Sequence, residues 1–476
     1  MRSSYFQRFG IYIFVILFAS VYYLVNAPLL LGHYDLGWHL AAGQLIRDHG
    51  QIPFHDPWSF TAGDAQWYNL SWLWDVIASL LFQYTDFSGL VFLVIACGAI
   101  IAGYLTSVCL SSGASPTAVY ISVLYSCLLY PSFATYPNIY LTASPNISTM
   151  LFCLMFYERC FKGKVVFLPA IMLLWANLHG GFLLGFFIVG VFAGVALLRR
   201  DWANFKIYNL AGVGCFIATF INPLGWHIYE GLTTVLGHFS QAYITEWWPF
   251  YRNITVPGSI PGIIYVLIFI AFELGYRGAC PLESRLLSWF FLALGLVQFR
   301  YMAFFFLFST IPFALHLSKL LPKKSNNFRM EKSLLAAGTV AACALPLVYI
   351  HIDPALGLPR MLSEPDVLHL RTHFSHARLL NHWNYGGILI FRTRGAIPVF
   401  VDGRAATAYP DALLRDYFKL AQLEIDETAW DTVIEKYQID TVLWVKAHEE
   451  LRQFLVGKRG WKEAYEGLYA SIYVKR

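Results

Sequence analysis

The residues most able to do chemistry lie in one polar stretch near the amino terminus, HYDLGWHLAAGQLIRDHGQIPFHDPWSFT at residues 33–61. Its titratable side chains are of the kinds that move protons in enzymes. Asp35 and His39 are four residues apart, so they share a face if a helix continues through them. Asp56 stands just before Pro57 in a turn-like segment. The stretch interleaves Trp38 and Trp58 with these acids and histidines: Asp35, His39, Asp48, His49, His55 and Asp56.

Each of these residues also has a purely structural explanation. Asp35 fits a solvated acid at a helix end, and His39 taken alone is more often a hydrogen-bonding group of the structure. Tryptophans are common where a membrane meets water. The grouping of acids and histidines beside an apolar segment nevertheless favours a functional role, because a carboxylate is costly to keep at a membrane boundary.

Three further segments place polar residues between apolar runs. His179 in WANLHGGFLLG (175–185) precedes two glycines that allow a tight reversal, and a simple turn explains it equally well. Glu246 lies in ITEWWPFY (244–251), whose aromatic residues suggest a loop on the interface. Arg300 in VQFRYMAFFF either extends toward lipid headgroups or pairs with a phosphate, which suits its planar guanidinium.

The composition indicates a polytopic membrane protein. Of 476 residues, 57% are apolar and 13% are charged, against about a quarter charged in ordinary soluble domains. A spanning helix needs about 20 mainly apolar residues. About eleven runs fit a span, although the short ones at 165–177 and 286–297 can also be read as re-entrant. The runs are 11–31, 89–110, 117–133, 143–157, 165–177, 180–198, 207–221, 259–274, 286–297, 302–318 and 333–350.

Basic residues predict the orientation, because Lys and Arg concentrate in cytoplasmic loops. With a cytoplasmic amino terminus, 15 of the 18 basic residues before residue 351 fall on the inner side. Residues 32–75, 222–258 and the C-terminal segment then lie outside, in a protein of the bacterial inner (plasma) membrane. The net charge of +5 reflects the inner loops, so we expect membrane lipids and not nucleic acid as partners.

After residue 350 the chain becomes soluble in character, with 16 basic and 16 acidic residues. We therefore expect a transmembrane domain at 1–350, with a first outer loop at 32–75, and an extracytoplasmic α/β domain at 351–476, connected through 351–383. Its expected strands are 388–391, 398–401, 441–445 and 470–474, with helices at 411–423 and 428–437. In VFVDGR, Asp402 and Arg404 follow one of these strands, where α/β domains tend to place binding loops. A structural turn is equally plausible there.

Taken together, four motifs resemble bacterial multi-spanning proteins of the GT-C glycosyltransferase superfamily. The layout is similar to that of protein O-mannosyltransferases and of lipid A aminoarabinose transferases, and the resemblance covers nearly the whole chain. It implies a GT-C fold and an inverting transfer of sugar from a polyprenyl phosphate to a hydroxyl of a glycan, lipid or protein acceptor. The motifs are DLGWHLAAGQLIRDHGQIPFHDPWSFT, NLHGG, NPLGW with EWWP, and NYGGILIFRTRGAIPVFVDGR.

The resemblance also implies roles for individual residues. Asp35 matches the acid that follows the first helix and would be the general base, and Asp56 matches a second acidic position. Arg300 would neutralise the leaving phosphate. The first outer loop has no Asp-x-Asp motif and the tail has no Trp-Trp-Asp signature, so a monophosphate donor is favoured and no metal or other cofactor is indicated. The residues expected to bind substrate are His39, His55, His179, Glu246, Asp402 and Arg404.

Two other functions fit the same residues. A transporter or flippase of a lipid-linked sugar would use charged residues near the bilayer midplane, but Glu273 is expected near the inner end of its span and no inverted repeat is visible. The other is a non-catalytic scaffold of a glycan-assembly complex. The glycosyltransferase, the transporter and the scaffold would all bind a polyprenyl phosphate. Only the glycosyltransferase would form a covalent product, so product formation distinguishes it from the other two.

Overall fold

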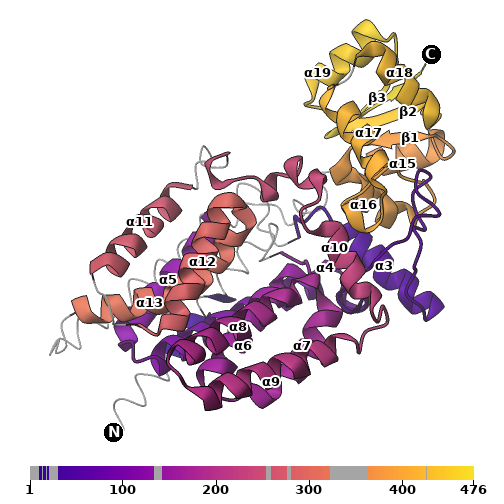
Figure 1. Ribbon diagram of the computed structural model, residues 1–476. Coiled ribbons are helices and arrows are strands. Elements are labelled where there is room, and N and C mark those ends of the chain that lie inside the picture. Colours follow the sequence, from indigo (N-terminus) through magenta and orange to yellow (C-terminus); the bar gives the residue numbers. More distant parts are fainter. Residues whose placement is uncertain are drawn as a thin grey trace. The chain divides into compact units, whose positions relative to one another are not determined.

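The computed structural model describes most of the chain (Figure 1). The described residues are 10–12, 14–17, 19–20, 31–132, 142–252, 259–275, 280–321, 362–424 and 426–475. The apolar run expected at 333–350 lies outside them, as does part of the run at 11–31. The chain forms two compact units, each assembled from separate segments. The first unit contains Met1–Leu30, Val91–Asn222 and Ile244–Asp353, and the second contains Leu31–Leu90, Pro223–Tyr243 and Pro354–Arg476.

The first unit consists of apolar helices joined by short turns. Charged residues mark several of their ends: α8 stops before Arg199 and Arg200, and Asp201 begins α9 by accepting the Asn204 backbone N–H at 3.1 Å. α12 packs against α13, and α8 packs against α9. The helices are α5 (Pro116–Ser132), α6 (Asn146–Phe161), α7 (Leu168–Leu178), α8 (Leu183–Leu198), α9 (Trp202–Thr219), α11 (Ser259–Gly275), α12 (Leu282–Val297) and α13 (Met302–Leu320). Single 3-10 turns are η1 (Val165–Phe167), η2 (Gly180–Phe182), η4 (Thr245–Trp247), η5 (Phe250–Arg252) and η6 (Phe299–Tyr301).

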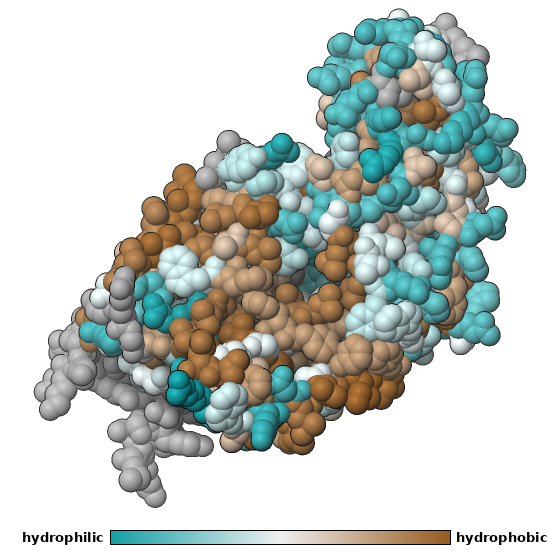
Figure 2. Space-filling model, in the orientation of Figure 1, coloured by the Kyte–Doolittle hydropathy of each residue, from teal (hydrophilic) through white to brown (hydrophobic). Residues whose placement is uncertain are grey.

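Several of these helices are apolar on their exposed faces as well as on their buried ones. In α9 the buried residues include Tyr208, Ala211 and Cys215, while Leu210 and Ile217 are 73% and 60% exposed. Figure 2 shows extensive hydrophobic surface over the helices of this unit. A helix that is hydrophobic all round suits a protein core or a membrane. Because the outward side chains of α9 have no protein cover, lipid is the fitting environment.

Within the described residues, three helices are long and apolar enough to cross a membrane: Trp72–Ser111, Gly180–Leu198 and Phe299–Leu320. Two shorter apolar helices are Val165–Leu178 and Gly262–Gly275. These helices indicate a membrane protein. The count of eleven spans and the cytoplasmic position of the amino terminus stay predictions.

The second unit combines helices with a four-stranded sheet of order β1-β2-β4-β3. β1 pairs in parallel with β2, and β4 is antiparallel to both β2 and β3. The strands are β1 (Leu379–Asn381), β2 (Thr441–Val445), β3 (Lys462–Glu466) and β4 (Ala470–Val474). The helices are α3 (Leu36–His49), α10 (His227–Val235), α15 (Glu364–His373), α16 (Trp383–Thr393), α17 (Asp411–Gln422), α18 (Glu427–Lys436) and α19 (Glu449–Arg452). The turns η3 (Phe239–Ala242) and η9 (Ala405–Thr407) and the π-helical segment η10 (Gln453–Lys458) complete it.

One long helix, α4 (Trp72–Ser111), begins in the second unit and ends in the first. Asp86 interrupts it, with backbone angles of φ 56° and ψ −153° that no helix adopts. The apolar run expected at 89–110 lies after this kink. The position of Asp75 in the first turn of α4 matters for the site described below.

The structure corrects part of the expected secondary structure in the tail. The strand expected at 388–391 is part of α16, and residues 398–401 form only a single bridge between Val399 and Ser59. The connection expected at 351–383 contains α15 and β1, and β3 was missed. The error has a physical reason, since a short continuous apolar run fits a buried helix as well as a buried strand. The strands at β2 and β4 and the helices α17 and α18 agree with the prediction.

Candidate active site

Asp35 stands immediately before α3, in close contact with the VFVDGR motif of the tail. Its backbone carbonyl accepts the His39 N–H at 3.1 Å, and its side chain is 28% exposed. A side-chain carbon placed on Gly403 would collide with the Asp35 carboxylate. Because Gly403 has no side chain, the Asp35 carboxylate can occupy the space beside it. Residues 35 and 403, remote in sequence, therefore lie side by side.

The surroundings of Asp35 shift its acidity toward neutral pH. Burial raises the pKa of Asp35 from 3.8 to about 6; the charge of His39 opposes this rise, and the charge of Asp402 adds to it. A general base works best when its pKa lies near the operating pH. The pKa of Asp35 is thus closer to neutral pH than that of an ordinary aspartate, and part of its side chain stays exposed.

His39 connects Asp35 to a second buried acid. The Nδ1 atom of His39 lies 2.6 Å from Oδ1 of Asp75, and both side chains are almost completely buried. Asn69 donates a hydrogen bond to the other Asp75 oxygen at 2.8 Å. The i, i+4 spacing of Asp35 and His39 predicted that the two share a face, and the charge of His39 acts on Asp35. Asp75 fixes the orientation of the imidazole, as a carboxylate partner does for histidines in general.

Arg404 is the centre of a buried ion-pair cluster. Its guanidinium lies 2.7 Å from Asp56 Oδ1 and 2.6 Å from Asp402 Oδ2, and all three side chains are buried. Tyr409 donates its hydroxyl proton to Asp402 Oδ2 at 2.6 Å. The ring of Trp58 lies 4.8 Å from the guanidinium carbon. Burial disfavours the charge, but Asp402, Tyr409 and Asp56 outweigh it and hold the pKa of Arg404 well above its usual value.

Asp56 has both carboxylate oxygens occupied. Oδ1 accepts the Trp58 backbone N–H at 3.1 Å and faces Arg404, and Oδ2 accepts the Ser59 backbone N–H at 3.1 Å and the Ser59 hydroxyl. These contacts tie residues 56–59 to the tail. They also leave Asp56 without the open surface that Asp35 has, and its catalytic role stays a prediction. Counted with Asp402 and Arg404, the cluster carries two negative charges and one positive charge.

Arg300 and Glu246, expected in separate loops, meet in the first unit. Arg300 Nη1 lies 3.2 Å from Glu246 Oε1, and the guanidinium carbon lies 4.0 Å from the ring centre of Trp247. The backbone of the two loops is also joined, because the Phe299 N–H donates to the Trp248 carbonyl at 2.9 Å. Stacking and pairing hold this guanidinium in one place. Asp35 belongs to the other unit, so the expected meeting of Asp35 with Arg300 stays a prediction.

The remaining two histidines have different surroundings. His179 ends α7 and begins η2, and its Nδ1 contacts the Thr149 hydroxyl at 2.6 Å and accepts the Gly181 N–H at 3.3 Å. This is the tight reversal that the two glycines predicted. His55 is exposed and forms a bridge with Gln66. Neither residue is grouped with Asp35 by a described contact, and their substrate roles stay predictions.

Sequence reasoning missed Asp75 and Tyr409, and it placed Gly403 in the VFVDGR motif without foreseeing its contact with Asp35. Asp75 could have been found as an isolated acid in the first turn of an apolar run, where a membrane protein keeps an acid only at a cost. The contact of Gly403 and the hydroxyl bond of Tyr409 depend on the tertiary structure, so their sequence context carries no signal for them. The same unit has a cavity of about 420 Å³ bordered by Tyr409, and its polar lining includes Gln66, Tyr68, Thr233, His238 and Asp411.

Comparisons with known proteins identify the fold. No protein-family model matches the chain, and no curated protein sequence matches it. Among solved structures, ArnT from Cupriavidus metallidurans bound to undecaprenyl phosphate is similar, with a TM-score of 0.55, 11% identity and coverage of 97% of each chain. The archaeal oligosaccharyltransferase AglB from Archaeoglobus fulgidus, in complex with an inhibitory peptide and a dolichol-phosphate, has a TM-score of 0.55 and 10% identity. That match covers 91% of this chain and 69% of AglB. The chain therefore shares its fold with ArnT and AglB, in agreement with the GT-C fold that its motifs led us to expect.

Proposed function

We propose that the protein is an inverting glycosyltransferase that moves a sugar from a polyprenyl-phosphate donor to an acceptor hydroxyl at the outer face of the membrane. The observation that carries the proposal is Asp35, a partly exposed carboxylate with a pKa raised to about 6, in contact with the tail motif of a GT-C fold. The similar structures of ArnT and AglB contain undecaprenyl phosphate and dolichol-phosphate, which supports a lipid-phosphate donor.

Asp35 is the general base of the proposed reaction. It removes the proton of the acceptor hydroxyl while that oxygen forms a bond to the anomeric carbon of the sugar. The bond between this carbon and the phosphate oxygen breaks, and the polyprenyl phosphate leaves with the bonding electrons. Attack from the face opposite the phosphate inverts the anomeric configuration. His39 is a positioning residue, since Asp75 fixes its ring and its charge favours the ionised form of Asp35.

Arg300 is proposed to bind the donor phosphate. A phosphate carries negative charge that grows on the leaving oxygen as the sugar is transferred, and a guanidinium stabilises it best when it is already oriented. The stacking on Trp247 and the ion pair with Glu246 provide that orientation. The ion pair with Glu246 also reduces the number of Arg300 N–H groups left for the phosphate, because one edge of the guanidinium already contacts the carboxylate.

The Arg404 cluster is proposed to position the residues that surround the acceptor. Its three charges hold the DGR turn against the first outer segment, which places Gly403 beside Asp35. The cavity bordered by Tyr409 has hydroxyl, amide and imidazole groups suited to a hydroxylated acceptor. Asp56 and Asp402 then act through Arg404 as positioning residues, and a catalytic role of Asp56, which the resemblance implies, is the alternative.

A reconstituted transfer assay with an isolated lipid-linked sugar pool tests the general base. Asp35→Asn keeps the shape of the side chain but cannot accept the proton, so we expect transfer to fall by about 100-fold or more. Asp48→Asn is the matched control, because Asp48 is an exposed acid at the other end of the same helix. Unchanged transfer in Asp35→Asn would remove Asp35 from the mechanism. Movement of the lipid-linked sugar across sealed vesicles without a covalent product would favour a transporter instead.

A donor-binding measurement tests Arg300. Arg300→Ala is expected to weaken donor binding by about 10-fold or more, since a hydrogen bond to a charged group contributes roughly 1.5–3 kcal/mol. Arg300→Lys should restore only part of this affinity because an ammonium lacks the planar fork. Arg252→Ala is the control, since Arg252 is exposed and packs near Trp248 in the same region. Equal donor affinity in wild type, Arg300→Ala and Arg300→Lys would refute the phosphate role.

A further inference from the structure

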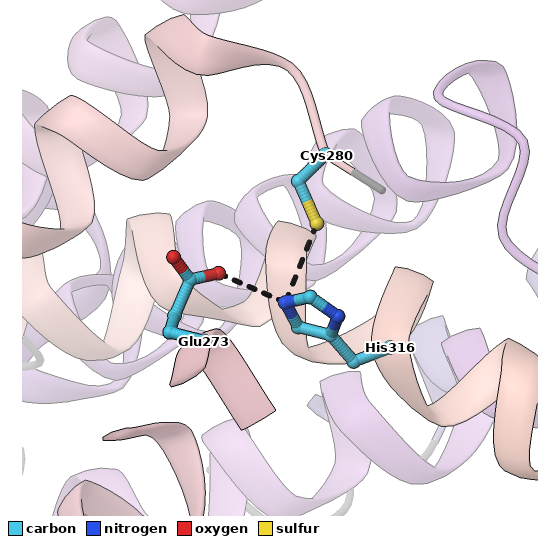
Figure 3. Close-up of side chains that lie close together, drawn as sticks. All are labelled: Glu273, Cys280 and His316. Carbon is cyan, nitrogen blue, oxygen red and sulfur yellow. Dashed lines mark hydrogen bonds and ion pairs between the residues drawn. The ribbon is translucent and has the colours of Figure 1, made fainter. Parts of the chain in front are cut away.

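Three side chains with metal-binding atoms converge at one place in the first unit (Figure 3). Glu273 comes from the end of α11, Cys280 from the segment just before α12, and His316 from the last turns of α13. His316 Nε2 lies 2.8 Å from Glu273 Oε1 and 3.5 Å from Cys280 Sγ. All three candidate ligand atoms lie within 4.8 Å of one another. None of these residues belongs to the proposed transfer site.

The glutamate is oriented by groups that bind only its far oxygen. Arg285 Nε donates to Glu273 Oε2 at 2.6 Å, and the Trp289 indole N–H donates to the same oxygen at 3.3 Å. The near oxygen, Oε1, therefore faces His316. Glu273 and His316 are 2% and 1% exposed, so the carboxylate and the imidazole are held among packed helices. A metal-ligating side chain usually has an outer partner of this kind, which fixes its direction.

We propose that Glu273, Cys280 and His316 bind one divalent cation of the zinc class. A thiolate, an imidazole and a carboxylate are the three ligand types that zinc takes in proteins, whereas calcium and magnesium prefer oxygen ligands alone. Zinc lies about 2.3 Å from sulfur and about 2.0–2.1 Å from nitrogen, so two such ligands are naturally about 3.5 Å apart in a tetrahedron. The sulfur-to-nitrogen separation in this cluster has that size.

On binding, the Cys280 thiol loses its proton to solvent and forms the sulfur–metal bond, and His316 coordinates through unprotonated Nε2. The thiolate and the carboxylate supply two negative charges to the divalent cation, and Arg285, which is paired with the far oxygen of Glu273 and is 26% exposed, leaves the loaded site with one net positive charge. The fourth coordination position would be taken by water. The bound ion joins the end of α11 to α13 and to the start of α12, and so acts as a clip between three helices.

Cobalt binding to the full-length protein in detergent tests the proposal directly. Purified protein is stripped with a chelator and titrated with Co²⁺, whose visible absorption reports tetrahedral geometry and whose thiolate charge-transfer band reports sulfur ligation. We expect one equivalent to bind with both signals, and equimolar Zn²⁺ to displace it. A wild-type spectrum without the thiolate band would overturn the site, whether or not any variant folds.

Variants then assign the ligands. Cys280→Ser and His316→Gln are each expected to lower Zn²⁺ affinity by more than about 100-fold, beyond the roughly 10–100-fold typical of losing an outer partner. Trp289→Phe, which removes one hydrogen bond to Glu273, should lower affinity by about 10-fold. Cys160→Ser is the matched control, because Cys160 is a buried free cysteine at the end of α6. Zinc should raise the melting temperature of the wild type and of Cys160→Ser but not of Cys280→Ser. Equal affinity in Cys280→Ser and wild type would refute the assignment, and the outcome is independent of sugar transfer.

Discussion

At the scale of single residues, Asp35 is held where its charge is disfavoured. Burial raises its pKa to about 6, so the folded protein prefers the protonated form more strongly than the unfolded chain does. Ionised Asp35 therefore destabilises the fold at neutral pH, and a residue with no other role would gain stability by losing its charge. This is the pattern expected of a group kept for its chemistry.

The sign of this effect gives a pH-dependent prediction for stability. Well below pH 4 Asp35 is protonated in both states and adds no penalty; the penalty grows as the pH rises from about 4 to about 6 and is complete above that. Asp35→Asn should therefore raise the melting temperature at pH 8 and lose most of this advantage at pH 4.5. A shift of two pKa units corresponds to about 3 kcal/mol at most, less for a side chain that keeps some solvent contact. Thermal unfolding in detergent at both pH values measures it, and an equal advantage at both would contradict the shifted pKa.

The sequence identified candidate residues of the site, but it did not predict which side chains they contact in the folded protein. Asp35, Asp56, Asp402 and Arg404 stood out by type and position, and the last three meet in one buried cluster. Their pairing depends on backbone paths that bring residue 61 within hydrogen-bonding distance of residue 400, where the Thr61 hydroxyl donates to the Phe400 carbonyl. Single-sequence patterns describe neighbours along the chain, so contacts of this range stay invisible to them.

At the scale of elements, a close crossing of α3 and α16 fixes the site. A side-chain carbon on Gly37 would collide with the Gly387 carbonyl, and Gly387 in turn lies against Trp38 and the Tyr34 carbonyl. The tail's glycine pair directly precedes the segment 388–391, which was expected to be a strand, and its use is to let two helices approach closely. Helix lengths and apolar faces were predictable from periodicity. The role of a small residue at a helix crossing was not, because it depends on which helix packs against it.

Gly37→Ala is therefore expected to destabilise the second unit. The added methyl group must push α16 away from α3, and overpacking of this kind costs about 1–3 kcal/mol. Gly457→Ala is the control, since a side-chain carbon there meets no neighbouring atom. Thermal unfolding in detergent compares the two. If Gly37→Ala melts with the wild type, the crossing is looser than these contacts imply.

At the scale of the whole molecule, the distribution of charge predicts the orientation that the proposed function needs. Asp35 and the DGR motif belong to the second unit with the polar tail, and Figure 2 shows hydrophilic surface over the tail elements. A donor carried by a polyprenyl phosphate is used at the outer face only if this unit lies there. The basic residues of the inner loops predict that it does.

Reporter fusions measure this orientation. Alkaline phosphatase is active only after export, and green fluorescent protein fluoresces well only in the cytoplasm. In a bacterial host we expect phosphatase activity from a fusion at the carboxyl terminus and fluorescence from a fusion at the amino terminus. The exchanged pair of fusions serves as the control and should be silent. Fluorescence from the carboxyl-terminal fusion would place the DGR motif inside and remove the outer-face reaction.

The interleaving of the second unit has a consequence for biogenesis. The Thr61–Phe400 hydrogen bond joins residues 339 positions apart, and the unit also takes in residues 223–243 from the middle of the chain. Residues 31–90 therefore leave the ribosome long before their partners in residues 354–476 are synthesised. Their contacts with the tail can form only after most of the polypeptide has been made. A premature stop anywhere before the DGR turn would leave Asp35 without its neighbour, so truncated chains are expected to lack the proposed transferase activity.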